Sequence, residues 1–236
     1  MPFIEPHSTI CVRLRCYWNE DVISESASAF LQRRENQLFL TTNWHVLSGR
    51  NTYTGQTLDP NTRIPTHLEV IFHSSELGLS REPIILPLYN QNEDPLWLMH
   101  GEGQKFDIAA LRIDAEAHNL VHHRTLQDLT QHEIRVNVGM KVSLLGYPLG
   151  LSMQGAFPIW KSGWLATEHM VERDDGAPVY LVDSATREGM SGSPVFLIAD
   201  GPYQHSDGST RLDGHRATKF LGIYSGRYGN SIEEEL

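Results

Sequence analysis

Residues 189–196 read Gly-Met-Ser-Gly-Ser-Pro-Val-Phe, and no other stretch of the chain says more about its fold. Ser191 lies between glycines, and a proline with an apolar run follows, as in a tight turn that leads into a buried strand. Glycine permits backbone conformations that other residues avoid, so the N–H groups of such a turn can point toward the hydroxyl's surroundings. A plain surface loop uses the same residue types, so the stretch indicates a nucleophile only in company with other residues.

Two further segments contain candidate partners for Ser191. Residues 39–47 read Phe-Leu-Thr-Thr-Asn-Trp-His-Val-Leu, and His45 follows a strand-like run that could aim its ring. The chain has 12 histidines, and a single histidine is more often structural than catalytic. Residues 106–113 read Phe-Asp-Ile-Ala-Ala-Leu-Arg-Ile, in which Asp107 opens an apolar strand. An aspartate there is also compatible with a simple turn.

Serine, histidine and aspartate can act together as nucleophile, general base and the group that orients the base. Their order here is His45, Asp107, Ser191, which is the order of the chymotrypsin fold and differs from that of subtilisins and α/β-hydrolases. The sequence therefore resembles the chymotrypsin-like (trypsin-like) serine peptidases, and specifically their bacterial cytosolic type.

The resemblance spans most of the chain. Residues 24–47 are similar to the family's first hairpin, and residues 142–150 (Val-Ser-Leu-Leu-Gly-Tyr-Pro-Leu-Gly) to a segment of HtrA-like and glutamyl-endopeptidase-like members. Residues 182–196 match the nucleophile region, and residues 221–226 resemble the strand that lines the substrate backbone. Residues 51–103 have no detailed counterpart and are expected to hold an elaborated loop.

The resemblance implies an all-β fold of two six-stranded antiparallel Greek-key β-barrels with the active site at their junction. We expect an N-terminal barrel over 1–114 with His45 and Asp107, a connector over 115–133, and a C-terminal barrel over 134–236 with Ser191. Apolar residues alternate with Arg13, Arg15 and Tyr17, which predicts a strand near 10–17. Further strands are predicted at 28–34, 37–42, 67–73, 83–88 and 107–113, then at 140–146, 159–167, 179–184, 194–199 and 218–225.

The same resemblance assigns the chemistry. Ser191 Oγ would attack the peptide carbonyl, His45 would carry the proton, and Asp107 would fix the imidazole tautomer. Residues Gly189, Met190 and Ser191 would form the oxyanion hole, through the N–H groups of the first and the last. Ser225 would hydrogen-bond Asp107 from the far side, although a plain polar residue at a strand end is equally consistent with the sequence.

Activation and specificity depart from the trypsin pattern. Met190 stands where trypsin-like zymogens carry an aspartate, so activation by N-terminal cleavage is not expected. Either the enzyme folds ready for action, or a fused or associated sensor domain controls it. Ala185 at the pocket floor removes the acid that trypsin needs, which leaves a small, apolar or acidic preference open. The expected substrate-binding residues are Ala185, Thr186, Arg187, Tyr224, Ser225, Gly226 and Arg227.

Composition narrows the remaining possibilities. A formal net charge of −10 argues against general binding to nucleic acid or anionic membranes. Cys11 and Cys16 are the only cysteines, and their odd separation puts them on opposite strand faces, so we expect no disulfide and a cytoplasmic, bacterial setting. No secretory signal is evident at the start. We expect no cofactor and no metal; the weak alternatives are His118 with His122 and His123, and a calcium site using Asp207 and Asp213.

The leading hypothesis is thus a serine endopeptidase that acts on proteins or peptides through an acyl-enzyme. The alternative is a catalytically silent trypsin-like fold that binds a peptide or protein, because fold does not fix function. Inactive relatives usually lose a residue of the Ser-His-Asp set, and this chain retains all three together with the glycines. That retention favours the enzyme.

Overall fold

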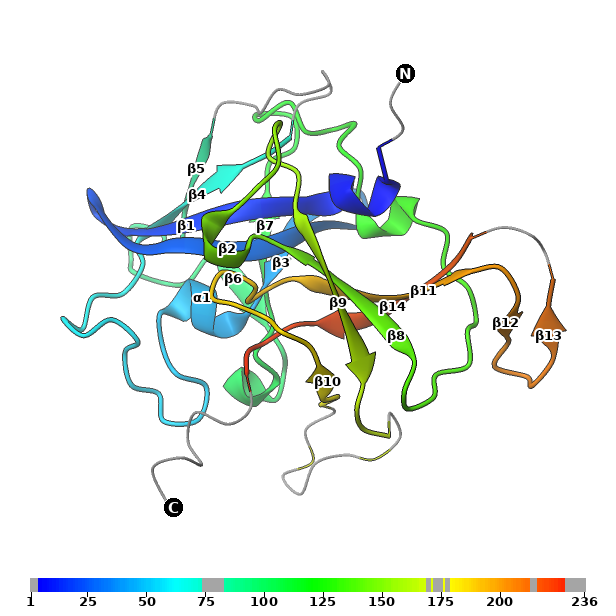
Figure 1. Cartoon of the computed structure of the whole chain (residues 1–236). Coiled ribbons are helices and arrows are strands. Elements are labelled where there is room, and N and C mark those ends of the chain that lie inside the picture. The colour runs from blue at the N-terminus through cyan, green and yellow to red at the C-terminus, as the bar shows by residue number, and fades with distance from the viewer. Residues whose placement is uncertain are drawn as a thin grey trace, which may run out of the picture.

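The computed structural model describes residues 4–73, 83–168, 171, 176, 179–212 and 216–227. Its described part consists mainly of strands with a few short helical turns (Figure 1). Two curled antiparallel sheets account for the architecture. The prediction of an all-β, chymotrypsin-like fold is therefore confirmed.

The first sheet has seven strands among the described residues, in the order β5-β4-β1-β2-β3-β7-β6. β5 and β6 are its two edge strands, and an isolated bridge between Tyr89 and Pro95 pairs the residues that follow β5 with those that precede β6, so the sheet curls toward closure. Its strands are β1 (Cys11–Trp18), β2 (Asp21–Arg34), β3 (Gln37–Thr42), β4 (His67–Ile71), β5 (Ile84–Pro87), β6 (Trp97–Met99) and β7 (Ala109–Ile113).

The period-two pattern of β1 explains why this sheet curls around a core. Val12, Leu14 and Cys16 are buried, whereas Arg13 and Arg15 between them are only half-buried. The buried set packs with leucines of β2, β3 and β4 in one continuous cluster. Each fully buried leucine stabilises the fold by roughly 1.5–3 kcal/mol.

The second sheet has five strands among the described residues, in the order β10-β9-β8-β11-β14. A separate two-stranded hairpin extends beyond β11. The strands of the sheet are β8 (Lys141–Gly146), β9 (Ile159–Leu165), β10 (Val182–Asp183), β11 (Pro194–Asp200) and β14 (Arg216–Ile223), and those of the hairpin are β12 (Tyr203–Gln204) and β13 (Thr210–Arg211).

Short helical segments connect the strands. The one α-helix among the described residues, α1 (Trp44–Ser48), contains His45. The connector forms a 3-10 turn at Leu126–Asp128, where Thr125 and Asp128 make a reciprocal capping box. Other 3-10 turns are η1 (Pro6–Ile10), η2 (Gly103–Phe106) and η4 (Pro148–Gly150). None of the described helices is long and apolar enough to cross a membrane.

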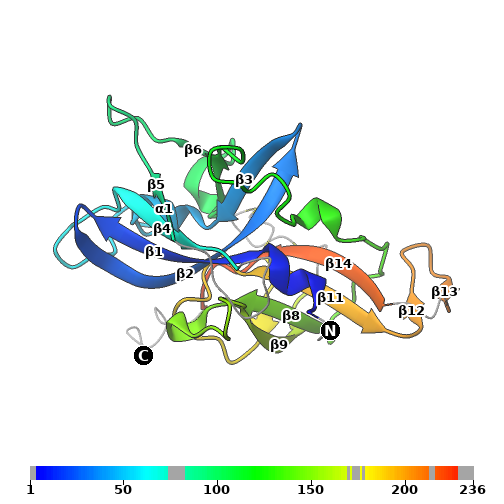
Figure 2. The same cartoon turned by 90° about the horizontal axis from the view of Figure 1, so that it is seen from above.

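The two sheets meet along β1 and β2 of the first and β8, β11 and β14 of the second (Figure 2). Cys11 belongs to the apolar cluster at this junction, together with Tyr147 and Phe196, whereas Cys16 lies in the core of the first sheet. Both cysteines are free, as expected from their opposite faces. Burial raises the pKa of the Cys16 thiol to about 12 and that of Cys11 further.

The strand predictions hold well, with two additions. β6 lies in the segment expected to hold an elaborated loop, and the β12–β13 hairpin lies outside the predicted strands. Among the described residues the first sheet has seven strands and the second has five, whereas six were expected in each barrel. The additional strands are only two or three residues long and are mostly exposed. Their pairing depends on neighbouring strands and leaves little trace in local periodicity. The domain limits at 114 and 134 stay a prediction.

Candidate active site

His45 and Asp107 lie together on the first sheet's side of the junction. The Nδ1 atom of His45 lies 2.8 Å from Oδ2 and 3.0 Å from Oδ1 of Asp107. The backbone N–H of His45 also donates to Oδ1 at 2.9 Å. Asp107 is buried (5% exposed). A carboxylate on Nδ1 leaves the Nε2 atom of a neutral imidazole free to accept a proton.

Local backbone geometry brings this pair together. α1 begins directly after β3, so the strand fixes the start of the turn that carries His45. Asp107 follows η2 with a left-handed φ of 46°, and β7 begins two residues later. The side-chain amide of Asn43 donates to the carbonyl of Asp107 at 2.8 Å. This bond ties the Asp107 turn to the start of α1.

Ser191 sits on the second sheet's side of the junction, in a loop formed by residues 187–193. Gly189 and Gly192 of this nucleophile loop have φ of 88° and 86°. A Cβ atom at Gly192 would lie 1.9 Å from the carbonyl oxygen of Ser28, so no side chain fits there. The backbone of Ser28 donates to the carbonyl of Ser191 at 2.8 Å, which fixes the loop against β2.

Ser225 connects the two sides. Its hydroxyl donates to Oδ2 of Asp107, and its carbonyl accepts from Ser191 Oγ at 3.3 Å. Within the described residues, Ser191 Oγ makes no hydrogen bond to His45. In enzymes without substrate such bonds are often long or misaligned and shorten only in the complex. A rotation about the Cα–Cβ bond of Ser191 re-aims its hydroxyl.

The three residues expected at the oxyanion hole differ in their backbone bonds. Neither Gly189 N–H nor Ser191 N–H donates to another atom within the described residues. The N–H of Met190 is occupied, because it donates to the carbonyl of Arg187 at 3.3 Å. The Met190 side chain is fully buried in the core of the second sheet. Two free N–H groups therefore flank the buried methionine.

The expected substrate-binding residues gather around the carbonyl of Thr186. Arg227 donates to this oxygen at 2.7 Å and Arg187 at 3.3 Å, while the hydroxyl of Thr186 bonds that of Tyr224 at 2.6 Å. Both arginines are exposed, and within the described residues neither pairs with a carboxylate. Ala185, Ser225 and Gly226 are exposed as well.

The two metal alternatives gain no support. The described residues contain no group of three or more His, Cys, Asp or Glu side chains arranged to hold a metal ion, and this includes His118, His122 and His123. Asp213 lies outside the described residues. Hydrogen bonds from Ser209 lower the pKa of Asp207 to about 2, so its carboxylate is already satisfied locally.

Three residues of the site were missed from the sequence. Ser26 and Ser28 of β2 hydrogen-bond the segment around Tyr147 and Gly189, and Leu149 bonds the carbonyl of Glu188. A detectable signal was present for the serines: Ser24, Ser26 and Ser28 repeat every second residue and therefore share one strand face. A strand face made of small hydroxyls indicates polar partners across it.

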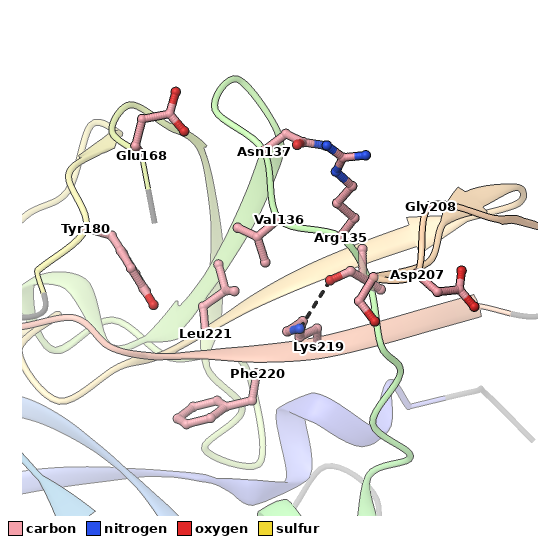
Figure 3. A pocket seen from close by; sticks show the side chains of 12 residues that line it. Arg135, Val136, Asn137, Glu168, Tyr180, Asp207, Gly208, Lys219, Phe220 and Leu221 are labelled. Carbon is pink, nitrogen blue, oxygen red and sulfur yellow. Dashed lines mark hydrogen bonds between the residues drawn. The ribbon is translucent and has the colours of Figure 1, made fainter. Parts of the chain in front are cut away.

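A cavity of about 780 Å³ lies elsewhere on the second sheet. Figure 3 shows Lys219 and Leu221 of β14 on one side and Tyr180 and Glu168 on the other. Lys219 Nζ donates to the carbonyl of Ile134 at 3.2 Å. None of His45, Asp107 and Ser191 lines this cavity.

Comparison with known proteins gives the family. In fold, the chain is similar to the crystal structure of Deg5 (TM-score 0.50, 14% identity, covering 93% of this chain and 80% of that one). It is likewise similar to AL20, a thermostable serine protease from an extremophilic microorganism (TM-score 0.51, 14% identity, 95% and 88% covered). No curated protein matches the chain. Residues 27–202, well over half of the sequence, match the model of the trypsin-like peptidase domain. The chain therefore belongs to the family of trypsin-like peptidase domains and is a serine endopeptidase, a hydrolase of peptide bonds.

Proposed function

We propose that the chain cleaves peptide bonds through an acyl-enzyme, with Ser191 as nucleophile, His45 as general base and Asp107 as the orienting group. The observation that carries this proposal is the 2.8 Å contact between His45 Nδ1 and the buried carboxylate of Asp107. Ser225 bonds both that carboxylate and Ser191 Oγ, which supports a joint role for the three side chains.

The steps follow from the chemistry of these groups. Ser191 Oγ attacks the carbonyl carbon while its proton moves to His45 Nε2, and the imidazolium formed is stabilised by Asp107. The C–N bond then breaks as His45 delivers the proton to the leaving amine, which gives the acyl-enzyme. Water attacks the ester in the same way, with His45 accepting its proton and returning it to Ser191 Oγ.

The oxygen of the attacked carbonyl gains negative charge in each transition state. We propose that it is stabilised by the N–H groups of Gly189 and Ser191, which have no other acceptor in the described part of the chain. Loss of one such donor typically costs roughly 10²–10³ in rate. Met190 contributes its buried side chain to the anchoring of this loop.

We propose that the residue before the scissile bond lies against Ala185–Arg187 and Tyr224–Arg227. The Arg227 guanidinium reaches from one of these segments to the Thr186 carbonyl of the other, which narrows the space between them. The guanidinium groups of Arg187 and Arg227, which pair with no carboxylate of the described residues, also make this space positive. This arrangement favours a short side chain, neutral or acidic, and disfavours lysine and arginine.

The setting is also part of the proposal. Two buried free thiols and a net charge of −10 are consistent with a cytoplasmic bacterial protein whose partners are protein or peptide substrates. Control by a fused or associated sensor domain remains a hypothesis. It would be overturned by a native gene product that is solitary and constitutively active.

An active-site fluorophosphonate probe tests the proposed function. We expect it to label the wild type and to leave Ser191→Ala unlabelled, with His45→Ala labelled at least about a hundredfold more slowly. Well-folded wild type that resists the probe and cleaves no member of a peptide library would favour the alternative, a silent fold that binds a peptide or protein. Retention of a peptide by Ser191→Ala together with unlabelled wild type would strengthen that alternative.

A further inference from the structure

The nucleophile loop is held from behind by a hydroxyl of the other sheet. Ser28 of β2 is completely buried, and its hydroxyl donates to the carbonyl of Gly189 at 2.7 Å. The same hydroxyl accepts from the backbone N–H of Tyr147 at 3.0 Å. One oxygen therefore connects β2, the oxyanion glycine and the turn formed by residues 147–150.

The turn of residues 147–150 also hydrogen-bonds the nucleophile loop at a second position. The N–H of Leu149 donates to the carbonyl of Glu188 at 2.7 Å, and Leu149 takes a left-handed φ of 53° to present it. Ser26, two residues before Ser28, donates to the carbonyl of Tyr147 at 2.9 Å and fixes the turn. The Tyr147 side chain is itself fully buried, and its hydroxyl bonds the carbonyl of Ala156 at 2.9 Å.

These bonds determine where the Gly189 N–H points. In a trans peptide the C=O and the following N–H point in opposite directions. With the carbonyl of Glu188 held by Leu149, the N–H of Gly189 is directed away from the turn. A reversed peptide would break the Leu149 bond and leave a carbonyl where the oxyanion must bind. A Cβ atom at Gly189 would lie 2.3 Å from the carbonyl oxygen of Tyr147, so the contact requires glycine.

We propose that Ser28, with Ser26 and Leu149, is a positioning relay that holds the oxyanion hole open without a charged partner. All of its bonds join hydroxyl and backbone groups, and the side chain beside the nucleophile is the buried, neutral Met190. The inference rests on the proposed function and adds a cause for it: the active arrangement is set by docking of the two sheets. Ser28 acts through Gly189 and touches no substrate.

Ser28→Ala is the direct test. Removing the hydroxyl frees the carbonyl of Gly189 and the N–H of Tyr147. The turn that holds Leu149 against the Glu188 carbonyl then loosens, so the Gly189 N–H loses its fixed direction. We expect kcat on a peptide substrate to fall about tenfold to a hundredfold while KM changes less than about twofold. Affinity for a peptide aldehyde, whose adduct with Ser191 carries the oxyanion, falls in parallel. Affinity for the cleaved product peptide stays unchanged.

Ser8→Ala is the matched control. Ser8 is also buried, and its hydroxyl accepts at 2.8 Å from Nε1 of Trp160, a side chain that packs against the junction cluster. We expect this variant to lose comparable thermal stability and to keep wild-type kcat. Ser26→Ala removes the outer bond of the relay at a half-buried position, so it folds more readily and lowers kcat about threefold.

The outcomes separate two failures. A folded wild type that neither turns over peptides nor binds the aldehyde would overturn the proposed function and the relay with it. An active wild type with unaltered kcat and aldehyde affinity in Ser28→Ala would overturn the relay alone. If Ser28→Ala does not fold, unaltered kcat in Ser26→Ala has the same consequence. Equal falls of kcat in Ser28→Ala and Ser8→Ala would also reject it.

Discussion

The two halves of the candidate site are built differently. On the first sheet, His45 and Asp107 are joined by ring and backbone hydrogen bonds around a buried carboxylate. On the second sheet, Ser191 is half-buried, and its hydroxyl bonds only the Ser225 carbonyl within the described residues. His45 and Asp107 are thus already hydrogen-bonded within one half of the site, whereas Ser191 is contributed by the other half. Residues at the junction have to supply the alignment.

The largest effect is expected from breaking the assembled pair. Asp107→Asn keeps the size of the side chain but offers an amide to His45 Nδ1, so the wrong imidazole tautomer is favoured. We expect kcat to fall about 10⁴-fold in steady-state peptide hydrolysis. Asp59→Asn is the control, because Asp59 is also a hydrogen-bonded carboxylate, held by Arg63 away from the site. A loss below about tenfold in Asp107→Asn would mean that the pair is structural.

Ser225→Ala sharpens the comparison, because it removes the hydroxyl that links the two halves. Its bond to Asp107 is lost, while the carbonyl that accepts from Ser191 remains. We expect kcat to fall about tenfold with KM nearly unchanged, measured on the same peptide. Ser209→Ala deletes a similar serine-to-aspartate bond at the exposed Asp207 and leaves kcat intact. Identical kinetics for both variants would show that the halves align without Ser225.

Arg227→Ala tests the second half by itself. A substrate pair that differs only by Asp or Asn before the scissile bond isolates the effect of charge. We expect the wild type to cleave the Asp peptide about fivefold faster in kcat/KM, and the variant to show no preference. Arg211→Ala, another exposed arginine, serves as control and retains the preference. Faster cleavage after lysine than after aspartate in the wild type would contradict the proposed pocket.

The smallest effect concerns the junction on which both halves depend. His7 packs its ring against Trp160 and Phe196, and burial lowers its pKa, an effect that Glu5 partly opposes. The folded pKa lies below the unfolded value of about 6.5, so the unfolded chain binds the proton more tightly. The stability that neutral His7 contributes is present above pH 6.5 and is lost as the pH falls toward the folded pKa. In urea unfolding, we expect His7→Phe to lose less stability than the wild type between pH 7.5 and 5; an equal loss would exclude His7 as a cause.

The sequence predicted the strands whose patterns are local. β2, β3 and β8 begin or end close to their expected limits because apolar alternation and turn residues mark them. β6 was not predicted, because a three-residue strand with Leu98 and Met99 exposed shows no alternation of apolar and polar residues. The capped 3-10 turn after Thr125 lies within the connector that was expected over 115–133.

Within the site, single residues with distinctive chemistry were predictable, and their supports were not. His45 and Asp107 were named from motifs and chain order, and Ser225 from the family resemblance; in the structure both His45 and Ser225 hydrogen-bond Asp107. Ser28 and Leu149 were not named. Ser28 bonds residues that lie more than a hundred positions away in the sequence. The role of Leu149 depends on the direction in which the Glu188 carbonyl points. Such hydrogen bonds depend on how the two sheets dock, and the docking cannot be predicted from local sequence patterns.

The contact between Ser28 and Ser191 also determines when, during synthesis of the chain, the site can form. The ribosome makes β2 long before Ser191 and Ser225, so the site cannot form on a nascent chain that lacks these two residues. A protease built this way cannot cleave its own emerging polypeptide until residues 191–225 have been made. Stalled chains of increasing length should therefore react with a fluorophosphonate only once residue 227 has left the exit tunnel, and earlier labelling would disprove this order.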